Sequence, residues 1–319
     1  MFIIHSNSMR ILITGGAGFI GSHLAEALKK QGHEVVVFDN LASGNGNLEF
    51  LKNSGSKLVK GNVAKFEEIK TAAKGIDTIY HLAAMNRFQR SVEKPLESFN
   101  INSLGTSNVL EAARQNDVKQ VIFSSSSSVY GDSKEFPRKE DGKIDPSHNY
   151  GASKVVGELY CKTYQKLYDL NTTVLRFFSV YGPKQRGDID YAAVIPKFIL
   201  NLLNGKALTI YGDGSQSRSF TYMADNVAAN IACMGNKKAF GEIINISDSK
   251  EFTITELVKL LEKVSGKKAK LEYMPLPKGD IQSNTADVSK AKKLLNWETK
   301  ISFEDGLRKT FEWMKKNAK

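Results

Sequence analysis

A tyrosine and a lysine four residues apart, Tyr150 and Lys154, are the side chains of this sequence that suggest chemistry most directly. Residues at this spacing lie on one face of a helix. A lysine ammonium near a phenol favours the phenolate, so the tyrosine can act as an acid and a base near neutral pH. Solvated helix faces often carry the same spacing. Here a glycine-rich loop and a serine cluster precede the pair, and the three features together indicate a dehydrogenase-type active site.

The glycine-rich loop follows the first predicted strand directly. Residues 11–14 are Ile-Leu-Ile-Thr, and the next seven satisfy the pattern Gly-x-Gly-x-x-Gly with Gly16, Gly18 and Gly21. Glycines permit a tight turn and a close approach to a pyrophosphate, and the following helix points its amide groups at that ligand. The next predicted strand ends in Asp39, 18 residues after Gly21. This carboxylate would bind ribose hydroxyls and repel a 2′-phosphate, which favours NAD over NADP.

Composition and charge narrow the class of protein. The chain has 319 residues, 41% hydrophobic and 25% charged, as is ordinary for a soluble globular protein. Its net charge of +11 could attract nucleic acid, but no dense basic run is present, and a phosphate-bearing small substrate fits equally well. The chain has only two cysteines, Cys161 and Cys233, which do not form a disulfide framework and are not spaced like metal ligands. We therefore expect no nucleic-acid partner, no metal and a reducing, cytoplasmic compartment. No apolar run approaches the roughly 20 residues that cross a bilayer, so no membrane partner is expected.

Strand-length apolar runs alternate with helical patterns through the first half of the chain, which predicts an α/β fold with a doubly wound parallel Rossmann sheet. Strands are expected at 10–14, 34–39, 57–60, 78–82, 120–124, 172–177 and 241–247. Helices are expected at 20–31, 66–73, 98–116, 150–168, 252–265 and 303–315. We expect an NAD-binding domain at 1–178, to which 223–247 returns. A smaller, interleaved C-terminal lobe at 179–222 and 248–319 would bind the substrate at the carboxyl edge of the sheet.

With the glycine loop, the block 124–131 and the block 150–154 in this order, the chain resembles the extended short-chain dehydrogenase/reductase family. Within that family it is similar to the nucleotide-sugar epimerases typified by UDP-glucose 4-epimerase. The resemblance runs from Met9 to the C-terminus, with matching blocks at 14–21, 81–84, 102–106, 124–131, 175–182, 208–220 and 286–295.

The resemblance implies a role for each residue of the active site. Tyr150 would be the acid and base, and Lys154 would hold the nicotinamide ribose. The assisting hydroxyl would be Ser126, four residues before Tyr130, with Ser125 and Ser128 as neighbours open to misassignment. Asn62 stands where the family commonly has an aspartate. The implied NAD contacts are Gly15, Gly18, Phe19, Ile20, Gly21, Asp39, Asn40, Ser43, Gly44, Asn62, Val63, Leu82, Ala83, Ala84, Asn102, Ser124, Tyr150, Lys154 and Phe177.

The resemblance also implies a UDP-sugar substrate. Tyr211 would pack on uracil and Arg218 would bind the diphosphate. Ser179 and Pro277 stand where the family has an asparagine and a second arginine. Where this chain has Asn284, some epimerases of the family have a bulky tyrosine that restricts the pocket to plain hexoses. The smaller side chain of Asn284 therefore predicts room for a 2-acetamido group. The implied substrate contacts are Asn86, Ser126, Ser128, Ser179, Val194, Thr209, Tyr211, Arg218, Asp280 and Asn284.

These observations favour an NAD-dependent 4-epimerase of UDP-hexoses, either UDP-glucose and UDP-galactose or their N-acetyl forms. A UDP-glucuronate epimerase is an alternative, because residues 177–183 resemble that branch too. A dehydratase or decarboxylase on the same fold is a second alternative. Dehydratases typically carry Asp-Glu where this chain has Ser127 and Ser128, which argues against dehydration. A non-catalytic NAD-binding scaffold would not need Ser126, Tyr150 and Lys154 together. The family expectation is a homodimer formed through residues 103–115 and 151–168.

Overall fold

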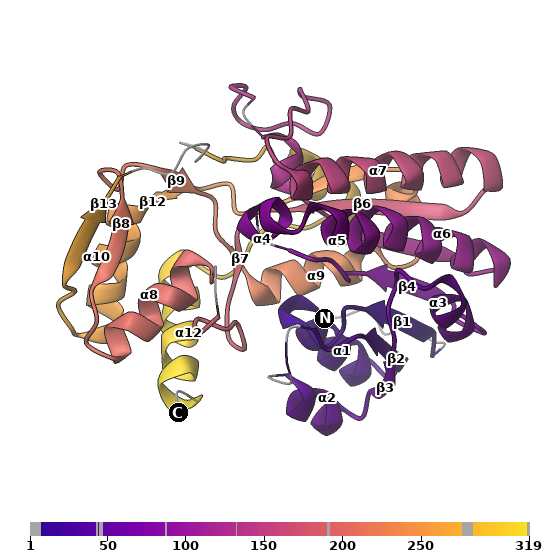
Figure 1. Ribbon diagram of the computed structural model, residues 1–319, viewed down its shortest axis with the longest axis horizontal. Coiled ribbons are helices and arrows are strands. Elements are labelled where there is room, and N and C mark those ends of the chain that lie inside the picture. Colours follow the sequence, from indigo (N-terminus) through magenta and orange to yellow (C-terminus); the bar gives the residue numbers. More distant parts are fainter. Residues whose placement is uncertain are drawn as a thin grey trace.

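The structure, a computed structural model, describes residues 8–42, 44, 47–86, 88–131, 133–189, 192–275 and 283–317. Its centre is a seven-stranded sheet in the order β11-β6-β5-β4-β1-β2-β3, in which every neighbouring pair is parallel (Figure 1). The strands are β1 (Arg10–Thr14), β2 (Glu34–Asp39), β3 (Lys57–Lys60), β4 (Thr78–His81), β5 (Gln120–Ser126), β6 (Asn171–Phe177) and β11 (Ile243–Ile246). The predicted α/β Rossmann fold is confirmed.

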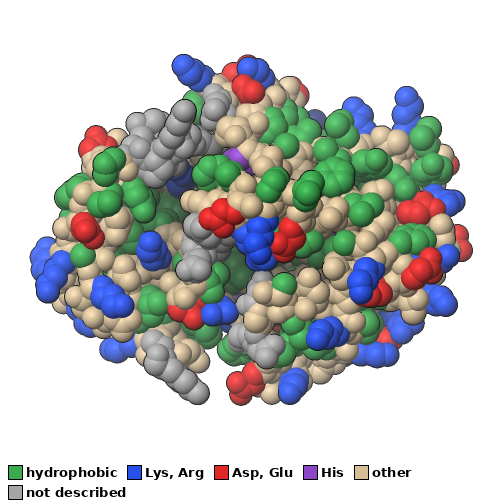
Figure 2. Space-filling view, viewed as in Figure 1, with side chains coloured by type: hydrophobic (Ala, Val, Ile, Leu, Met, Phe, Trp, Pro, Cys, Tyr) green, Lys and Arg blue, Asp and Glu red, His purple; other side chains and the backbone are tan. Residues whose placement is uncertain are grey.

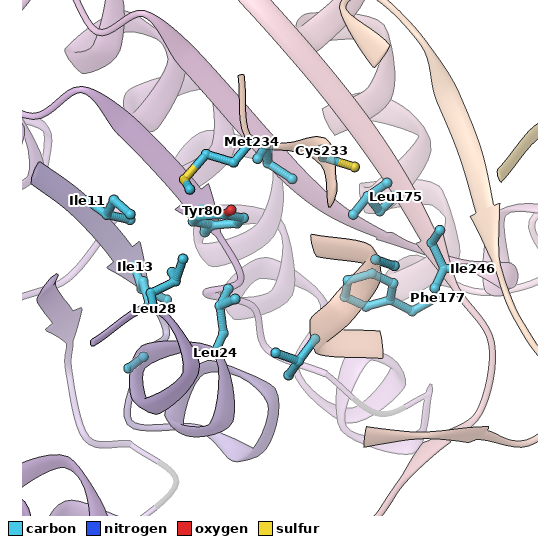
Figure 3. Packing of buried hydrophobic residues seen from close by; sticks show 14 of the residues in the cluster. Ile11, Ile13, Leu24, Leu28, Tyr80, Leu175, Phe177, Cys233, Met234 and Ile246 are labelled. Carbon is cyan, nitrogen blue, oxygen red and sulfur yellow. The ribbon is translucent and has the colours of Figure 1, made fainter. Parts of the chain in front are cut away.

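Helices cover both faces of this sheet, because its strands are apolar on both sides. On one face, α1 (Phe19–Lys30) and α9 (Met223–Cys233) pack in a cluster with Ile11, Ile13 and Tyr80, which Figure 3 shows from close by. On the other face, Leu12, Val121 and Phe123 pack with side chains of α3 (Phe66–Ala72), α6 (Gly105–Gln115) and α7 (Asn149–Tyr168). The carboxyl ends of the strands are thereby left as the edge where a ligand can bind.

The second part of the chain has a core of its own, formed by buried side chains such as Phe198, Leu208, Leu257 and Phe311. It lies to the left of the sheet in Figure 1 and contains α8 (Val194–Leu203), α10 (Ile254–Ser265), α12 (Phe303–Asn317) and the parallel pair β8 (Leu208–Tyr211) and β13 (Leu271–Met274). Two short strand pairs accompany it, β7 (Val180–Tyr181) with β10 (Thr221–Tyr222) and β9 (Ser217–Arg218) with β12 (Phe252–Thr253). The remaining α-helices of the described residues are α2 (Leu48–Ser54), α4 (Phe88–Glu93), α5 (Pro95–Ser98) and α11 (Ser289–Leu295).

Two elements differ from the sequence expectation in ways that concern the site. The strand expected at 120–124 continues to Ser126, because Ser125 and Ser126 pair with Arg176 and Phe177 of β6. The single helix expected at 98–116 is divided into α5, a π-helical segment at Phe99–Leu104 and α6. The domain boundaries stay a prediction, and within the described residues no helix has the length and apolar character to cross a membrane.

Candidate active site

A cavity of about 670 Å³ lies at the carboxyl edge of the sheet, between the sheet and the second lobe. Figure 2 shows the molecule hollowed between these two parts of the chain. The glycine loop lines one region of the cavity, Ser126 and Tyr150 line another, and Arg218 and Phe220 of the second lobe line a third. The volume falls within the usual range for small-ligand sites, roughly 300–1,000 Å³.

The glycine loop forms a cradle that side chains would fill. Gly15 has φ +71°, and a Cβ built there would lie 2.6 Å from the backbone nitrogen of Ala83. A Cβ at Gly21 would lie 2.5 Å from the Gly15 carbonyl oxygen. Helix α1 begins directly after this turn, so its first amide groups favour an anion. The bare backbone and the helix start fit the pyrophosphate of a dinucleotide.

Asp39, the acid at the end of β2, lines the same region of the cavity. Its Oδ2 accepts a hydrogen bond from the Ala17 amide at 2.9 Å, and its Oδ1 accepts one from the Leu41 amide at 2.8 Å. The carboxylate therefore holds the glycine loop as well as facing the cavity. Carboxylates have more lone-pair sites than these two bonds use, so oxygens remain able to accept from ribose hydroxyls.

Tyr150 and Lys154 lie in the first two turns of α7, which begins beside the end of β5. The His148 side chain accepts a hydrogen bond from the Gly151 amide at 3.1 Å and so caps this helix. The Lys154 ammonium donates to the Ser124 carbonyl at 2.8 Å and lies 5.7 Å from the centre of the Tyr150 ring. Burial lowers the pKa of Lys154 to about 8, and the Glu158 carboxylate opposes that shift. The ammonium is thus placed beside the phenol, as their spacing predicts.

The serines that end β5 divide into two groups by their partners. The Ser126 hydroxyl accepts from the Ser128 amide and donates to the Ser128 hydroxyl, both at 3.1 Å, and both residues line the cavity. Ser125 also lines the cavity, but it is buried and its hydroxyl donates to the Glu158 carboxylate. These contacts favour Ser126 over Ser125 as the assisting hydroxyl, a role that stays a prediction.

Asn102 lies behind the cavity, in the π-helical segment. Its Oδ1 accepts from the Met85 amide at 2.7 Å, and its Nδ2 donates to the Met85 carbonyl and to the Ser153 hydroxyl, both at 3.1 Å. The side chain is 2% exposed and is not among the residues that line the cavity. Asn102 therefore connects the loop after β4 to the start of α7.

The structure brings most of the remaining predicted site residues together. The cofactor set that lines the cavity comprises Gly15, Gly18, Phe19, Ile20, Gly21, Asp39, Asn40, Gly44, Asn62, Val63, Leu82, Ala83, Ala84, Ser124, Tyr150, Lys154 and Phe177. The substrate set that lines it comprises Asn86, Ser126, Ser128, Ser179, Val194 and Arg218. Ser43, Pro277 and Asp280 lie outside the described residues.

Three predicted substrate contacts are described but do not line the cavity: Thr209, Tyr211 and Asn284. Tyr211 is exposed on β8, next to β13. The Asn284 amide donates to the Ser127 hydroxyl at 2.9 Å and is 8% exposed, so it is tied to the serine cluster. Its role as a gate for sugar size stays a prediction.

Sequence reasoning missed several cations that line the cavity. Arg90 comes from α4, and Lys184 and Arg186 come from the segment after β7. The Lys184 ammonium pairs with Glu26 of α1 at 2.8 Å and is only 7% exposed, although 158 residues separate the two in sequence. The run Lys-Gln-Arg after Tyr-Gly-Pro was the available signal, but no spacing rule links it to the site.

The model of the NAD dependent epimerase/dehydratase family matches residues 11–247. The chain belongs to this family. It is 39% identical to the UDP-glucuronate 4-epimerase of Thermodesulfobacterium geofontis over 96% of each chain.

Solved structures with the same fold extend over almost the whole chain. The UDP-glucose 4-epimerase of Thermotoga maritima, solved with UDP-glucose, is 35% identical with a TM-score of 0.93, covering 98% of this chain and 100% of that one. The UDP-glucuronic acid 4-epimerase of Bacillus cereus, solved with UDP-glucuronic acid and NAD, is 33% identical with a TM-score of 0.89, covering 97% and 100%. The cofactor is therefore NAD, which the glycine cradle and Asp39 fit. Among the described residues, no group of three or more His, Cys, Asp and Glu side chains could hold a metal ion.

Proposed function

We propose that this protein is an NAD-dependent 4-epimerase of UDP-hexoses. The observation that carries the proposal is the arrangement of Ser126, Tyr150 and Lys154 on one cavity, between the glycine loop and Arg218. A substrate that spans the cavity would have its sugar near the phenol and its diphosphate near a guanidinium, which suits an anion of this shape.

The chemistry that NAD supplies when bound is reversible hydride transfer. The residues of the chain handle the proton. The Tyr150 phenolate would take the proton of the sugar 4-hydroxyl, and the Tyr150 hydroxyl so formed would return it after the ring has turned over. The Lys154 ammonium favours the phenolate that this step needs. The Ser126 hydroxyl would hold the same oxygen of the sugar by a hydrogen bond. No net oxidant is consumed, because one proton and one hydride leave and return.

A UDP-glucuronate 4-epimerase is the second candidate, and the cations of the cavity favour it. Arg90 and Arg186 line the cavity in addition to Arg218. Arg90 pairs with Glu97 and Arg186 pairs with Asp188. A sugar carboxylate that took the place of either partner would meet a guanidinium, which recognises a carboxylate by a bidentate geometry. The glucuronate 4-epimerase similarity supports this candidate as well.

A panel of sugars tests both candidates. The purified protein is mixed, without added cofactor, with UDP-glucose, UDP-N-acetylglucosamine or UDP-glucuronate, and the products are separated and identified. A 4-epimer of any of the three supports the epimerase, and the sugar that reacts fastest decides its substrate. Loss of carbon dioxide from the glucuronate would identify a decarboxylase instead, and a keto sugar that has lost water would identify a dehydratase. No reaction with any sugar would refute the proposal.

We also propose that two copies of the chain associate through residues 103–115 and 151–168, as the family resemblance implies, and that the neighbouring helices α4 and α5 extend this surface. These helices expose Val92, Leu96, Phe99, Leu159 and Leu167. Exposed apolar groups in such number on adjacent helices are uncommon on a monomer. Leu96→Glu should convert the dimer to a monomer in sedimentation or light scattering, whereas Tyr273→Glu on the distant β13 should not. A wild-type monomer at micromolar concentration would contradict the proposal.

A further inference from the structure

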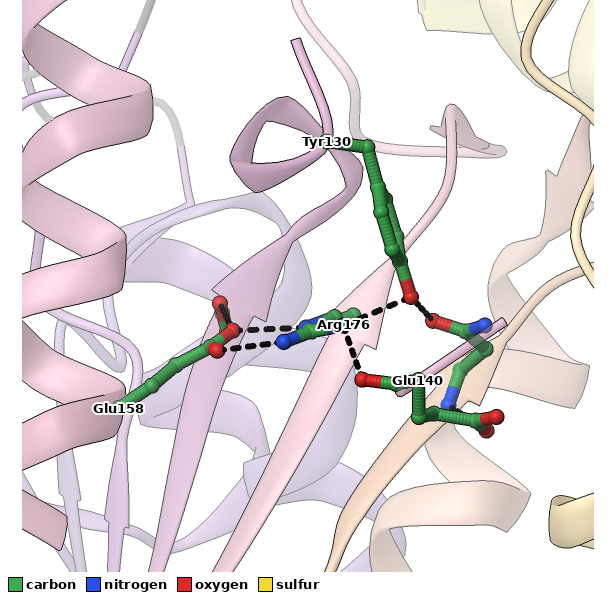
Figure 4. A network of polar contacts seen from close by, with 6 residues as sticks. Tyr130, Glu140, Glu158 and Arg176 are labelled. Carbon is green, nitrogen blue, oxygen red and sulfur yellow. Dashed lines mark hydrogen bonds and ion pairs between the residues drawn. The ribbon is translucent and has the colours of Figure 1, made fainter. Parts of the chain in front are cut away.

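A buried ion pair lies directly behind the catalytic end of β5. The Arg176 guanidinium donates from Nε to Glu158 Oε1 at 2.9 Å and from Nη2 to Glu158 Oε2 at 2.7 Å (Figure 4). The two side chains are 0% and 3% exposed. Glu158 belongs to α7 and Arg176 to β6, so the pair joins the helix that carries Tyr150 to the sheet.

The pair is connected to the site on both sides. Arg176 lies opposite Ser125 in the register of β5 and β6, and the hydroxyl of Ser125 donates to the same Glu158 carboxylate. Glu158 therefore holds two adjacent strands against α7, one of which ends in Ser126. Tyr150, Lys154 and Glu158 are spaced by four residues each and so follow one face of the helix.

The far side of the guanidinium is held as firmly as the near side. Arg176 Nη1 donates to the Tyr130 hydroxyl at 2.8 Å and to the Glu140 carbonyl at 3.1 Å. The Tyr130 hydroxyl donates in turn to Asn245 Oδ1 at 2.7 Å. A network in which each member is satisfied is rigid, so Arg176 has little freedom to leave Glu158.

Stability alone does not account for such a pair, because well-packed apolar residues can often replace a buried ion pair without loss of stability. Its placement one helical turn beyond Lys154 suggests a different reason. Burial lowers the pKa of Lys154 to about 8, and the Glu158 charge acts in the opposite direction. Lys154 must keep its proton if it is to favour the phenolate of Tyr150.

The other titratable neighbours of the Lys154 ammonium supply little charge near pH 7. Burial raises the pKa of the Cys161 thiol on α7 far above its usual value, so the thiol is neutral. Burial lowers the pKa of His81 on β4 to about 3, so the imidazole is neutral too. Tyr150 is the proton-transfer partner itself. Glu158 is therefore the carboxylate that favours the charged form of Lys154.

We propose that Glu158, fixed by Arg176, is a positioning residue of the reaction: it keeps Lys154 protonated beside Tyr150 and, through Ser125, holds the Ser126 end of β5 against α7. The assignment rests on the proposed roles of Tyr150 and Lys154. It adds Glu158 and Arg176, which do not line the cavity, and Ser125, whose hydroxyl is engaged by Glu158.

The first test measures the proton on Lys154 without any substrate. Lysine side chains are labelled with ¹³C in the holoenzyme, the Lys154 signal is assigned by its loss in Lys154→Arg, and its titration is followed by NMR. In Glu158→Gln the midpoint should fall by about one pH unit or more. The control Glu111→Gln removes a carboxylate that pairs with Arg114 on α6, and should leave the midpoint unchanged. An unchanged midpoint in Glu158→Gln would overturn the proposal.

Because Glu158→Gln leaves Arg176 buried without its carboxylate, the variant can fail to fold. The double variant Glu158→Gln with Arg176→Met removes both charges and keeps the test decisive. Its Lys154 midpoint should also fall, and an unchanged value would again overturn the proposal.

The second test concerns position rather than charge. Ser125→Ala removes the link to β5 without leaving an unpaired charge, and should lower kcat by about tenfold with KM and NAD content within twofold of wild type. Near-normal kcat would refute the positioning of β5. With Glu158→Gln, the alkaline limb of the kcat profile should move to lower pH together with the Lys154 midpoint. If wild type turns over no UDP-sugar while the midpoint still moves, the proposed function fails and the effect of Glu158 on Lys154 stands.

Discussion

Gly15→Ala should remove NAD from the protein, because the glycine loop cannot accept a side chain at this position. Two separate costs, one conformational and one steric, oppose the alanine. The first is conformational, since Gly15 has φ +71° and a residue with a Cβ in this region costs about 1–2 kcal/mol. The second is steric, because the new Cβ would lie 2.6 Å from the Ala83 nitrogen and 2.7 Å from its Cα. Backbone atoms cannot move aside as the end of a flexible side chain can, and overpacking of this kind costs about 1–3 kcal/mol. Together these two costs predict that the free energy of unfolding falls by about 2–5 kcal/mol, unless the glycine loop is displaced to relieve the contact.

Gly32→Ala is the matched control, because it separates the conformational cost of a positive φ from the steric cost of a new Cβ. Gly32 follows α1 with φ +87°, and a Cβ there would meet nothing within 4 Å. It should therefore show the conformational cost alone, with NAD content as in wild type. The assay releases bound nucleotide with acid, quantifies it per chain, and compares the unfolding midpoints of the two variants. If Gly15→Ala retains full NAD and is no less stable than Gly32→Ala, the close approach of the glycine loop to Ala83 is not what shapes the cofactor site.

Three further predictions concern the chemistry. Tyr150→Phe should lower turnover by roughly 10²–10⁴-fold while the fold and NAD content are retained; near-normal turnover would assign the proton to another residue. Arg218→Ala should weaken the binding of UDP by about 1.5–3 kcal/mol without changing NAD content, as measured by titration calorimetry, and unchanged affinity would place the diphosphate elsewhere. Because burial lowers the pKa of Lys154 to about 8, the unfolded chain binds more protons than the folded one between that value and the ordinary lysine pKa near 10.4. In this window Lys154 makes stability rise with pH, so Lys154→Met should be most stabilising relative to the cofactor-free wild type below pH 8. The advantage should shrink towards pH 10.5, and an advantage that grows with pH would contradict the prediction.

The sequence predicted the first half of the fold and its cofactor loop closely, because the signals there are local. The buried strand β1, the glycine turn and the amphipathic α1 are adjacent in the chain, and each has a short-range pattern. Tyr150 and Lys154 were found for the same reason, since a spacing of four residues fixes their common face within one helix. No tertiary information was needed for either feature.

The ion pairs around the site could not be predicted in this way. Glu158 and Arg176 meet because α7 packs over β6, and Lys184 reaches Glu26 across 158 positions of sequence. The π-helical segment at Phe99–Leu104 lies in a run whose periodicity predicts an uninterrupted helix. Long-range side-chain packing decides these features, and a short stretch of sequence carries no information about that packing.

The same difference explains why the reaction is easier to predict than the substrate. The groups proposed to move the proton lie on α7 and at the end of β5, and those proposed to hold NAD lie at or just after the ends of β1, β2 and β4, where register and helix spacing place them. The groups proposed to face the sugar and phosphates lie largely on connecting segments, such as Ser179 with φ +33° and Arg186 after β7, and on the second lobe at Arg218. The geometry of such segments follows from long-range contacts, so one substitution can change the sugar without disturbing the acid, the base or the cofactor.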